Sequence, residues 1–348
     1  MARRDRQSQL FRDLIARLSP ELQRAVITAW EDIRASIDWG GLRAALERQD
    51  VDRAIAALNI EPAAFEAYRA AATSAYAQGG VLAATTINAP AGSRVSFRFD
   101  MTNPRAEAWI SQNVGEMITG LADTAKDVAR QSILTGYQAG RHPHSIALDL
   151  AGRVVSGRRA GGVIELDGPR ADRFLALSRA METAEGVRDL VVMRDGVPAV
   201  RYKVNAATEA RILRAWRNGE AVSGPDREVS LRQYKNKLLN ERAKLIAQKE
   251  TASAVMSARR EEWQQVLDKL GAPASAVIKS WRHGGGVKEP RWWHVQANNQ
   301  QVRGLDTPFQ LANGASIQFA HDPAAPLSET AGCTCDTTFR LDHTWNLA

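Results

Sequence analysis

The chain has few cysteines and no long hydrophobic run. Only two of its 348 residues are cysteines, Cys333 and Cys335, which excludes the disulfide framework of a small secreted protein. The apolar runs at 81–92 and 188–193 are interrupted by polar residues or turn formers, well before the roughly 18 residues that a membrane-spanning helix needs. The basic N-terminus leads into an amphipathic stretch and not into the apolar core of a signal peptide. From these absences we expect no membrane contact and a cytoplasmic location.

The signatures of common enzyme classes are also missing. Gly284-Gly285-Gly286 has no Lys-Ser/Thr pair after it, so this run is not a phosphate-binding loop. The sequence contains neither a Gly-x-Ser-x-Gly elbow nor a His-Glu-x-x-His helix. We therefore expect no catalytic residue, no cofactor and no enzymatic activity.

What the chain does contain is the composition of an ordinary globular protein with an excess of basic residues. Hydrophobic residues make up 44% and charged residues 24%, and the formal net charge is +7. The length is sufficient for two or three domains of about 100–200 residues each. A basic balance admits a polyanionic partner such as DNA, although many basic proteins carry such a charge without binding nucleic acid.

The first 80 residues have the spacing of a helical bundle. Apolar residues recur at helical intervals from Phe11 onward. Ser19-Pro20 has the form of an N-cap followed by proline at the first helical position, which predicts that a second helix begins there. Asp50 is expected to cap a later helix. Pro62 is expected to open the last helix of the bundle, and Gly79-Gly80 to end it.

The middle region, 81–226, mixes helices with short strands. Apolar and polar residues alternate between Val95 and Phe99, as in a half-buried strand. Asn103-Pro104 predicts a helix start. Two apolar runs flank Asp195-Gly196, a dipeptide typical of tight turns, so we predict a β-hairpin near 190–204.

Residues 227–270 have the strongest helical pattern, and Gly271 and Pro273 are expected to end this helix. The remaining segment, 271–348, is rich in glycine, proline and tryptophan and predicts a compact domain. The predicted fold class is therefore α+β and mainly α. It comprises an N-terminal helical bundle, long central helices with a β-hairpin, and a small α+β C-terminal domain of short strands and loops.

Several short motifs follow one another between Tyr234 and the cysteines. In order, they are Ile246-Ala247-Gln248-Lys249-Glu250, Trp263, Lys279 with Trp281, Arg291 with His294, Pro308 with Phe309, Asn313-Gly314, Pro323, Glu329, and Cys333 with Cys335. In order and spacing they resemble the phage Mu F-like family of minor head, or head-morphogenesis, proteins of tailed bacteriophages. The run 158–164 and the stretch from Phe99 to Trp109 also resemble that family, whereas the first 80 residues are similar only in being helical.

The chain departs from the family pattern at two motifs. The family's Ala-Arg-Thr-Glu is Ala247-Gln248-Lys249-Glu250 here, and its Asn-Cys-Arg-Cys is Gly332-Cys333-Thr334-Cys335. An arginine is missing from the first motif, and an asparagine and an arginine from the second. We therefore interpret the motif residues as structural.

The resemblance implies a minor virion structural protein that acts in phage head morphogenesis. It implies a protein bound in few copies near the portal inside the procapsid, found in the virion and, during assembly, in the host cytoplasm. The implied partners are the portal protein and other head proteins. One alternative is a DNA-binding or genome-ejection accessory protein of the head, in contact with packaged DNA. A metal-dependent enzyme built around His294 and the two cysteines is the third interpretation.

Glu250 needs a partner if its helix is partly buried, because a buried carboxylate must be paired or hydrogen-bonded. One interpretation is a polar latch between Glu250 and Arg291 or His294 in the C-terminal domain. The other is local pairing along the helix with Arg242 or Lys249.

His294, Cys333 and Cys335, with His321 as a possible fourth residue, belong to the types that bind zinc. However, a single Cys-x-Cys lacks the two- to four-residue gaps of zinc knuckles. A disulfide between residues i and i+2 would be strained, and Thr334 does not favour a turn that brings both sulfurs to one side. The sequence therefore predicts no bound metal and two reduced thiols.

Without a metal, His294 is expected to hydrogen-bond near Glu329 or Glu250. The nearby tryptophans could stack on nucleic-acid bases, but such clusters more often form the core of a small domain. We predict that this core contains Trp281, Phe309 and one residue of the pair Trp292-Trp293.

Overall fold

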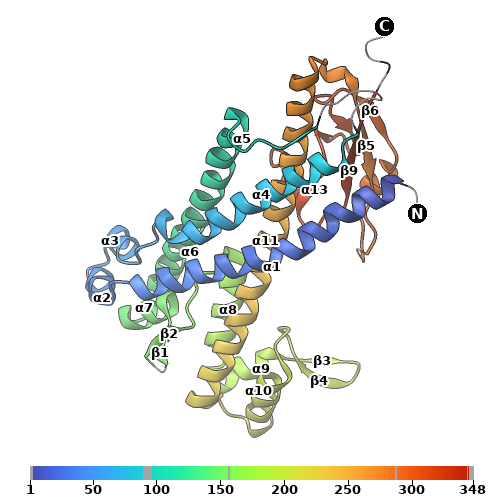
Figure 1. The fold of residues 1–348 in the computed structure, drawn as a ribbon. Helices are drawn as coiled ribbons and strands as arrows, with labels where there is room; N and C mark the ends of the chain where they lie inside the picture. The colour runs from blue at the N-terminus through green and yellow to red at the C-terminus, as the bar shows by residue number, and fades with distance from the viewer. Residues whose placement is uncertain (1–2, 89–95, 156, 287, 343, 345–348) are drawn as a thin grey trace. The chain divides into compact units, whose positions relative to one another are not determined.

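A computed structural model describes residues 3–88, 96–155, 157–286, 288–342 and 344. Long helices dominate the fold, and small antiparallel sheets of two or three strands accompany them (Figure 1). The predicted fold class, α+β and mainly α, is confirmed.

The chain divides into two compact units, each assembled from separate parts of the sequence. Unit 1 comprises Met1–Val26, Glu66–Met117 and Lys244–Ala348, and unit 2 comprises Ile27–Phe65 and Ile118–Ala243. The four segments predicted from the sequence are each one continuous stretch of the chain. They were defined by changes of composition along the sequence, which do not show contacts between distant residues.

The helices have the following bounds in chain order: α1 (Arg3–Ser36), α2 (Trp39–Glu47), α3 (Val51–Ala56), η1 (Pro62–Phe65), α4 (Glu66–Thr86), α5 (Pro104–Trp109), the π-helical turn η2 (Ile110–Val114), α6 (Gly115–Gln138), α7 (Pro143–Ala151), α8 (Gly168–Ala180), α9 (Ala184–Leu190), α10 (Ala206–Asn218), α11 (Gly224–Leu270), η3 (Ala274–Ala276), α12 (Trp292–Gln296) and α13 (Leu327–Thr330).

The strands form four antiparallel sheets within the described residues. Unit 2 contains the hairpins β1–β2 (Arg153–Val155, Arg158–Ala160) and β3–β4 (Val191–Arg194, Val197–Val200). Unit 1 contains a three-stranded sheet in the order β6–β5–β9 (Gln301–Arg303, Val277–Arg282, Asp336–Leu341). It also contains the short pair β7–β8 (Phe309–Gln310, Ser316–Ile317).

Local signals placed several elements correctly. Asp50 and Asn103 cap α3 and α5 by accepting hydrogen bonds from the backbone N–H groups of Arg53 and Arg105. The predicted hairpin is β3–β4, and its turn residues Asp195-Gly196 have φ angles of +49° and +77°. These features depend on residues close in sequence, which is why the sequence predicted them.

Proline 20 does not begin a new helix, contrary to the expectation. Helix α1 continues through Pro20, and the Ser19 hydroxyl donates a hydrogen bond to the Ile15 carbonyl across 2.7 Å and caps nothing. Leu18 and Leu22, on either side of the proline, are both buried. Burial of this continuous apolar face offsets the one backbone hydrogen bond that proline cannot donate.

The glycine pair 79–80 does not end its helix either, because α4 continues to Thr86. A Cβ atom on Gly79 would lie 2.7 Å from the Cα of Val255, and one on Gly80 would lie 2.1 Å from the Phe99 ring. The two glycines therefore allow Val255 and Phe99 to pack closely against α4. This tertiary contact overrides the tendency of glycine to break a helix.

The strand expected between Val95 and Phe99 is not formed by residues 96–100, which have no regular secondary structure. The side chain of Gln265 instead satisfies the Asp100 backbone, accepting from its N–H at 2.9 Å and donating to its carbonyl at 3.0 Å. Val95 and the turn expected at Ala91-Gly92 lie outside the described residues.

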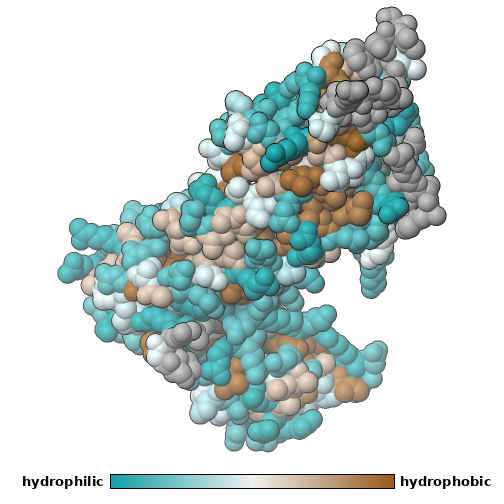
Figure 2. Space-filling view, in the orientation of Figure 1, coloured by the Kyte–Doolittle hydropathy of each residue, from teal (hydrophilic) through white to brown (hydrophobic). Residues whose placement is uncertain are grey.

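The main apolar core of unit 1 is formed by residues from α1, α4, α11 and β9. It includes Phe11, Tyr76, Val255, Trp263 and Phe339, all nearly inaccessible to solvent. The face drawn in Figure 2 is mostly hydrophilic, with hydrophobic residues scattered between. Among the described helices, none is both long and apolar enough to span a bilayer.

Candidate metal centre

Three potential metal ligands converge in unit 1. His294 lies on α12, and Cys333 and Cys335 lie in the loop that leads into β9. The two sulfur atoms are 3.6 Å and 3.7 Å from the His294 Nδ1 atom, and all three ligand atoms lie within 4.8 Å of one another. The expectation that the sulfurs would diverge is therefore wrong.

The backbone around the cysteines explains this convergence. Gly332 has a φ angle of +64°, so the chain turns sharply just before Cys333. The Thr334 hydroxyl donates to the Gly284 carbonyl across 3.0 Å, and a Cβ atom on Gly284 would lie 1.9 Å from the Thr334 carbonyl oxygen. Both cysteines precede β9, which begins only at Asp336, so this turn and the contact with Gly284 set the direction of their side chains.

Glu329 on α13 fixes the orientation of the histidine ring. The His294 Nε2 atom is 2.8 Å from Glu329 Oε2, and the carboxylate also accepts hydrogen bonds from Trp293 Nε1 and Asn313 Nδ2. Burial works to raise the pKa of Glu329, but these hydrogen bonds lower it below its usual value. An ionised carboxylate can only accept, so Nε2 carries a hydrogen, and Nδ1 is the ring atom that faces the sulfurs.

The pKa values of the two thiols are shifted in opposite directions. A hydrogen bond from Cys335 lowers the pKa of Cys333, and the same bond together with burial raises the pKa of Cys335. The Cys335 backbone N–H also donates to the Cys333 sulfur across 3.4 Å. Burial tends to lower the pKa of His294, but hydrogen bonds with Cys333 and Glu329 raise it. A thiolate beside an oriented imidazole can attract a cation.

A cavity of about 380 Å³ is lined in part by Cys333 and Cys335. Its wall is formed by residues of α1, including Arg12 and Ser19, by residues of α11, including Lys249, and by both cysteines. A small ligand in this cavity would therefore lie beside both cysteines, even though Cys335 is buried.

His321, named from the sequence as a possible fourth ligand, does not belong to the three-residue group. Its Nε2 atom is 3.0 Å from the Cys335 carbonyl oxygen, which needs a donor, so Nε2 carries the hydrogen. Its Nδ1 atom is buried and has no hydrogen-bond partner among the described residues. His321 also lines the cavity.

The predicted aromatic core of the C-terminal segment is confirmed. Trp281 is 1% exposed, and its ring centroid lies 5.2 Å from that of His294 and 5.4 Å from that of Phe309. Trp293 packs against the same cluster, whereas Trp292 is 60% exposed. The core interpretation of the tryptophans therefore holds for Trp281 and Trp293.

The other motif residues surround this core. Lys279 is buried, its ammonium donates to the Gln318 carbonyl across 2.8 Å, and burial lowers its pKa to about 8. Arg291 donates to the Ala331 carbonyl across 2.7 Å. Pro308 is half-buried immediately before β7.

Glu250 does not form the expected contact with the C-terminal domain. Its carboxylate lies 2.6 Å from the Lys249 ammonium, and within the described residues it forms no ion pair with Arg291 or His294. The local alternative is therefore confirmed. The latch to the C-terminal domain is wrong, because adjacent Lys249 already supplies a counter-charge.

A different buried pair connects α11 with β9, and the sequence reading missed it. Arg259 Nη1 lies 2.8 Å from Asp336 Oδ1. The sequence does contain a pattern that indicates this pair. Arg259 directly follows a run of small and apolar residues, 251–258, all of which are buried. A charge in such a run requires a partner.

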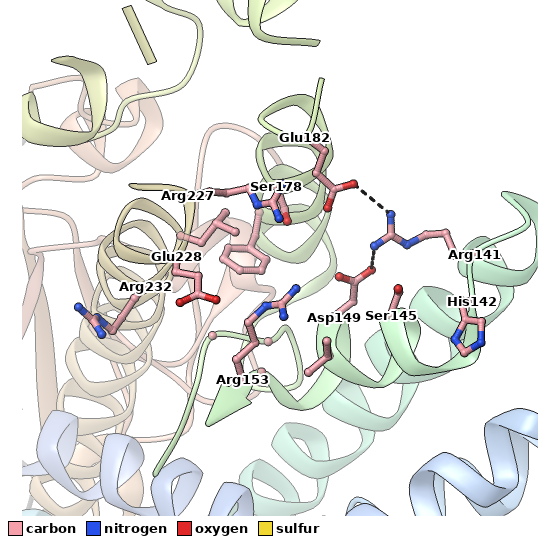
Figure 3. A pocket seen from close by; sticks show the side chains of 16 residues that line it. Arg141, His142, Ser145, Asp149, Arg153, Ser178, Glu182, Arg227, Glu228 and Arg232 are labelled. Carbon is pink, nitrogen blue, oxygen red and sulfur yellow. Dashed lines mark ion pairs between the residues drawn. The ribbon is translucent and has the colours of Figure 1, made fainter. Parts of the chain in front are cut away.

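Unit 2 contains a separate, charged cavity of about 290 Å³. In Figure 3, Arg141 forms ion pairs with Asp149 and Glu182, at 3.2 Å and 3.8 Å, while Arg153 and Glu228 also line the space. Both acidic and basic side chains line it, so this cavity favours no ligand of one charge.

Comparison with known proteins gives no match to a protein-family model, to a curated protein or to a solved structure.

Proposed function

We propose that the protein is a minor structural protein of a phage head, acting in head morphogenesis near the portal inside the procapsid. The observation that carries the proposal is the spatial convergence of the C-terminal part of the motif that resembles the Mu F-like family. Motif residues from distant positions, from Lys279 to Cys335, surround the Trp281 ring in one small cluster.

The contacts of these residues support a structural role. The Lys279 ammonium lies 5.5 Å from the centroid of the Phe309 ring, which itself packs on Trp281. Glu329 accepts three hydrogen bonds from its own chain, and Arg291 donates to a backbone carbonyl. Polar groups whose hydrogen bonds are all formed within the chain stabilise a small domain. A structural component of a protein assembly needs such a stable domain.

The proposal is tested with particles of the phage or prophage that encodes this chain. Mass spectrometry of purified procapsids and mature heads is expected to detect the chain in substoichiometric amount relative to the major capsid protein. A host cytoplasmic protein of equal abundance in the lysate is the control for carry-over. Complete absence of the chain from both kinds of particle would contradict the proposal.

The net charge of +7 supports a second candidate, a DNA-binding or genome-ejection accessory protein of the head. The tryptophans add little to it, because Trp281 is buried and the Trp293 indole N–H is bound to Glu329. Phosphate contacts would make the affinity for duplex DNA fall steeply with salt. A shift assay at several salt concentrations tests this, and no binding at low salt would remove the candidate.

A further inference from the structure

We propose that His294, Cys333 and Cys335 bind one zinc ion through Nδ1 and the two sulfur atoms, with a water molecule from the adjoining cavity as the fourth ligand. This site does not depend on the proposed head function. It reverses the prediction from the sequence that no metal is bound. That prediction assumed that the two sulfurs do not come together, whereas in the folded chain both lie close to His294 Nδ1.

The separations between the ligand atoms carry the proposal. Zinc binds imidazole nitrogen at about 2.0–2.1 Å and thiolate sulfur at about 2.3 Å, so tetrahedral angles place nitrogen and sulfur about 3.6 Å apart. The Nδ1 atom of His294 lies 3.6 Å from one sulfur and 3.7 Å from the other. An ion can therefore enter with little movement of the side chains.

The groups around the ligands match those of metal sites. A histidine that binds a metal usually donates its other N–H to a carboxylate, which fixes the ring and its tautomer. Glu329 stands in this position toward His294 Nε2. The Cys335 N–H, which donates to the Cys333 sulfur, stabilises a thiolate in the same way that backbone donors stabilise other metal-bound sulfurs.

The ligand set favours zinc among the divalent metals. Imidazole and thiolate together suit zinc, whereas magnesium and calcium prefer oxygen ligands. Two thiolates balance the charge of Zn²⁺, which matters for a largely buried site. Binding releases the remaining thiol protons to the solvent.

A cysteine nucleophile activated by His294 is the main competing interpretation. A nucleophile and its base need only one sulfur near the imidazole, yet both sulfurs lie at nearly equal distances from Nδ1. The second sulfur has a clear role only if the two cysteines share a ligand, which is why the geometry favours the metal.

The fourth position faces the cavity. His321 uses Nε2 on the Cys335 carbonyl, and the cavity of about 380 Å³ that borders both sulfurs has room for water. The ion would tie α12 to the loop before β9, two segments between which β6, β7, β8 and α13 lie in sequence.

The experiment uses the full chain, purified from cells grown with added zinc and dialysed against metal-free buffer. Elemental analysis is expected to find one equivalent of zinc per chain. His294→Ala, Cys333→Ser and Cys335→Ser should each lose it, whereas His283→Ala, which changes a histidine of the same domain outside the group, should retain it. Zinc-free wild-type protein, or equal zinc in the ligand variants and the control, would overturn the proposal.

A second measurement, cobalt binding by the wild-type chain, does not depend on the folding of the ligand variants. Cobalt added to the metal-free wild-type chain should give the thiolate charge-transfer and tetrahedral d–d bands of a site with two sulfurs. Glu329→Gln should retain the bands but weaken zinc affinity roughly 10–100-fold. Rapid alkylation of a cysteine by iodoacetamide, unchanged by zinc, would favour the nucleophile and contradict the metal site.

Discussion

Arg259 and Asp336 form a buried ion pair in unit 1, with 2.8 Å between Nη1 and Oδ1 and side-chain exposures of 0% and 3%. Arg259 belongs to α11 and Asp336 is the first residue of β9. The Arg259 guanidinium also lies 3.8 Å from the ring centroid of Phe11 on α1. This single side chain therefore links two long helices with the three-stranded sheet.

Breaking this pair should destabilise unit 1 strongly. Asp336→Asn leaves a buried guanidinium without a counter-charge, a change that costs about 3–5 kcal/mol. Asp306→Asn is the matched control, because Asp306 pairs with the neighbouring Arg260 but is 61% exposed, and exposed pairs contribute about 0–1 kcal/mol. Urea denaturation measures both variants. Equal losses would show that burial of the Arg259–Asp336 pair does not matter.

Trp281→Ala should remove the centre of the C-terminal cluster. Truncation of a buried large aromatic residue costs about 3–5 kcal/mol in the free energy of unfolding. Trp292→Ala, which removes a 60% exposed ring next to the same cluster, should change it by only about 0.5 kcal/mol. Thermal melts and limited proteolysis compare the two, and an unchanged melt for Trp281→Ala would refute the packing described.

Two glycine-to-alanine changes should have effects of opposite sign. The added methyl group of Gly79→Ala would lie 2.7 Å from the Cα of Val255, so α4 and α11 must separate at a cost of about 1–3 kcal/mol. Gly120 lies in the interior of α6 with no atom within 4 Å of the added carbon. Gly120→Ala should therefore stabilise the chain by about 0.5–1 kcal/mol. Chemical denaturation measures the change in the free energy of unfolding for both variants and so tests both signs.

Glu262 should make stability depend on pH. Burial raises its pKa from 4.5 to about 7, Glu261 adds to the shift, and Lys269 opposes it. The folded chain keeps this proton while the unfolded chain loses it, so stability falls as pH rises from about 4.5 to 7. Glu262→Gln should flatten this slope and stabilise the protein above pH 7 by up to about 3 kcal/mol.

Urea denaturation between pH 5 and pH 8, with steps of about one unit, tests the role of Glu262. Exposed Glu220 provides the control variant Glu220→Gln, which should keep the slope of the wild type. A wild-type slope in Glu262→Gln would show that this carboxyl group does not hold its proton in the folded chain.

The sequence predicted those features that depend on neighbouring residues. Asp50 and Asn103 cap their helices through N–H groups two or three residues away, and Asp195-Gly196 needs only its own φ angles to form a turn. The tendency of a tryptophan cluster to form the core of a small domain also led to the correct prediction that Trp281 and Phe309 are core residues.

Features fixed by distant contacts were not predictable in the same way. Proline 20 and Gly79 have strong local tendencies, but packing along α1 and against Val255 overrides them. The Cys-x-Cys segment was interpreted as extended, although its turn depends on Gly332 and on contact with Gly284. No local pattern shows that these residues meet.

The sheet order β6–β5–β9 has a consequence for the speed of folding. Strand β5 pairs with β6 nearby in sequence and with β9 only after the segment that contains β7, β8 and α13. The partners Arg259 and Asp336 are likewise 77 positions apart. Closing so large a loop loses chain entropy before the new contacts compensate for it. The docking of β9 is therefore expected to be a late step in the folding of unit 1, after the helices have formed.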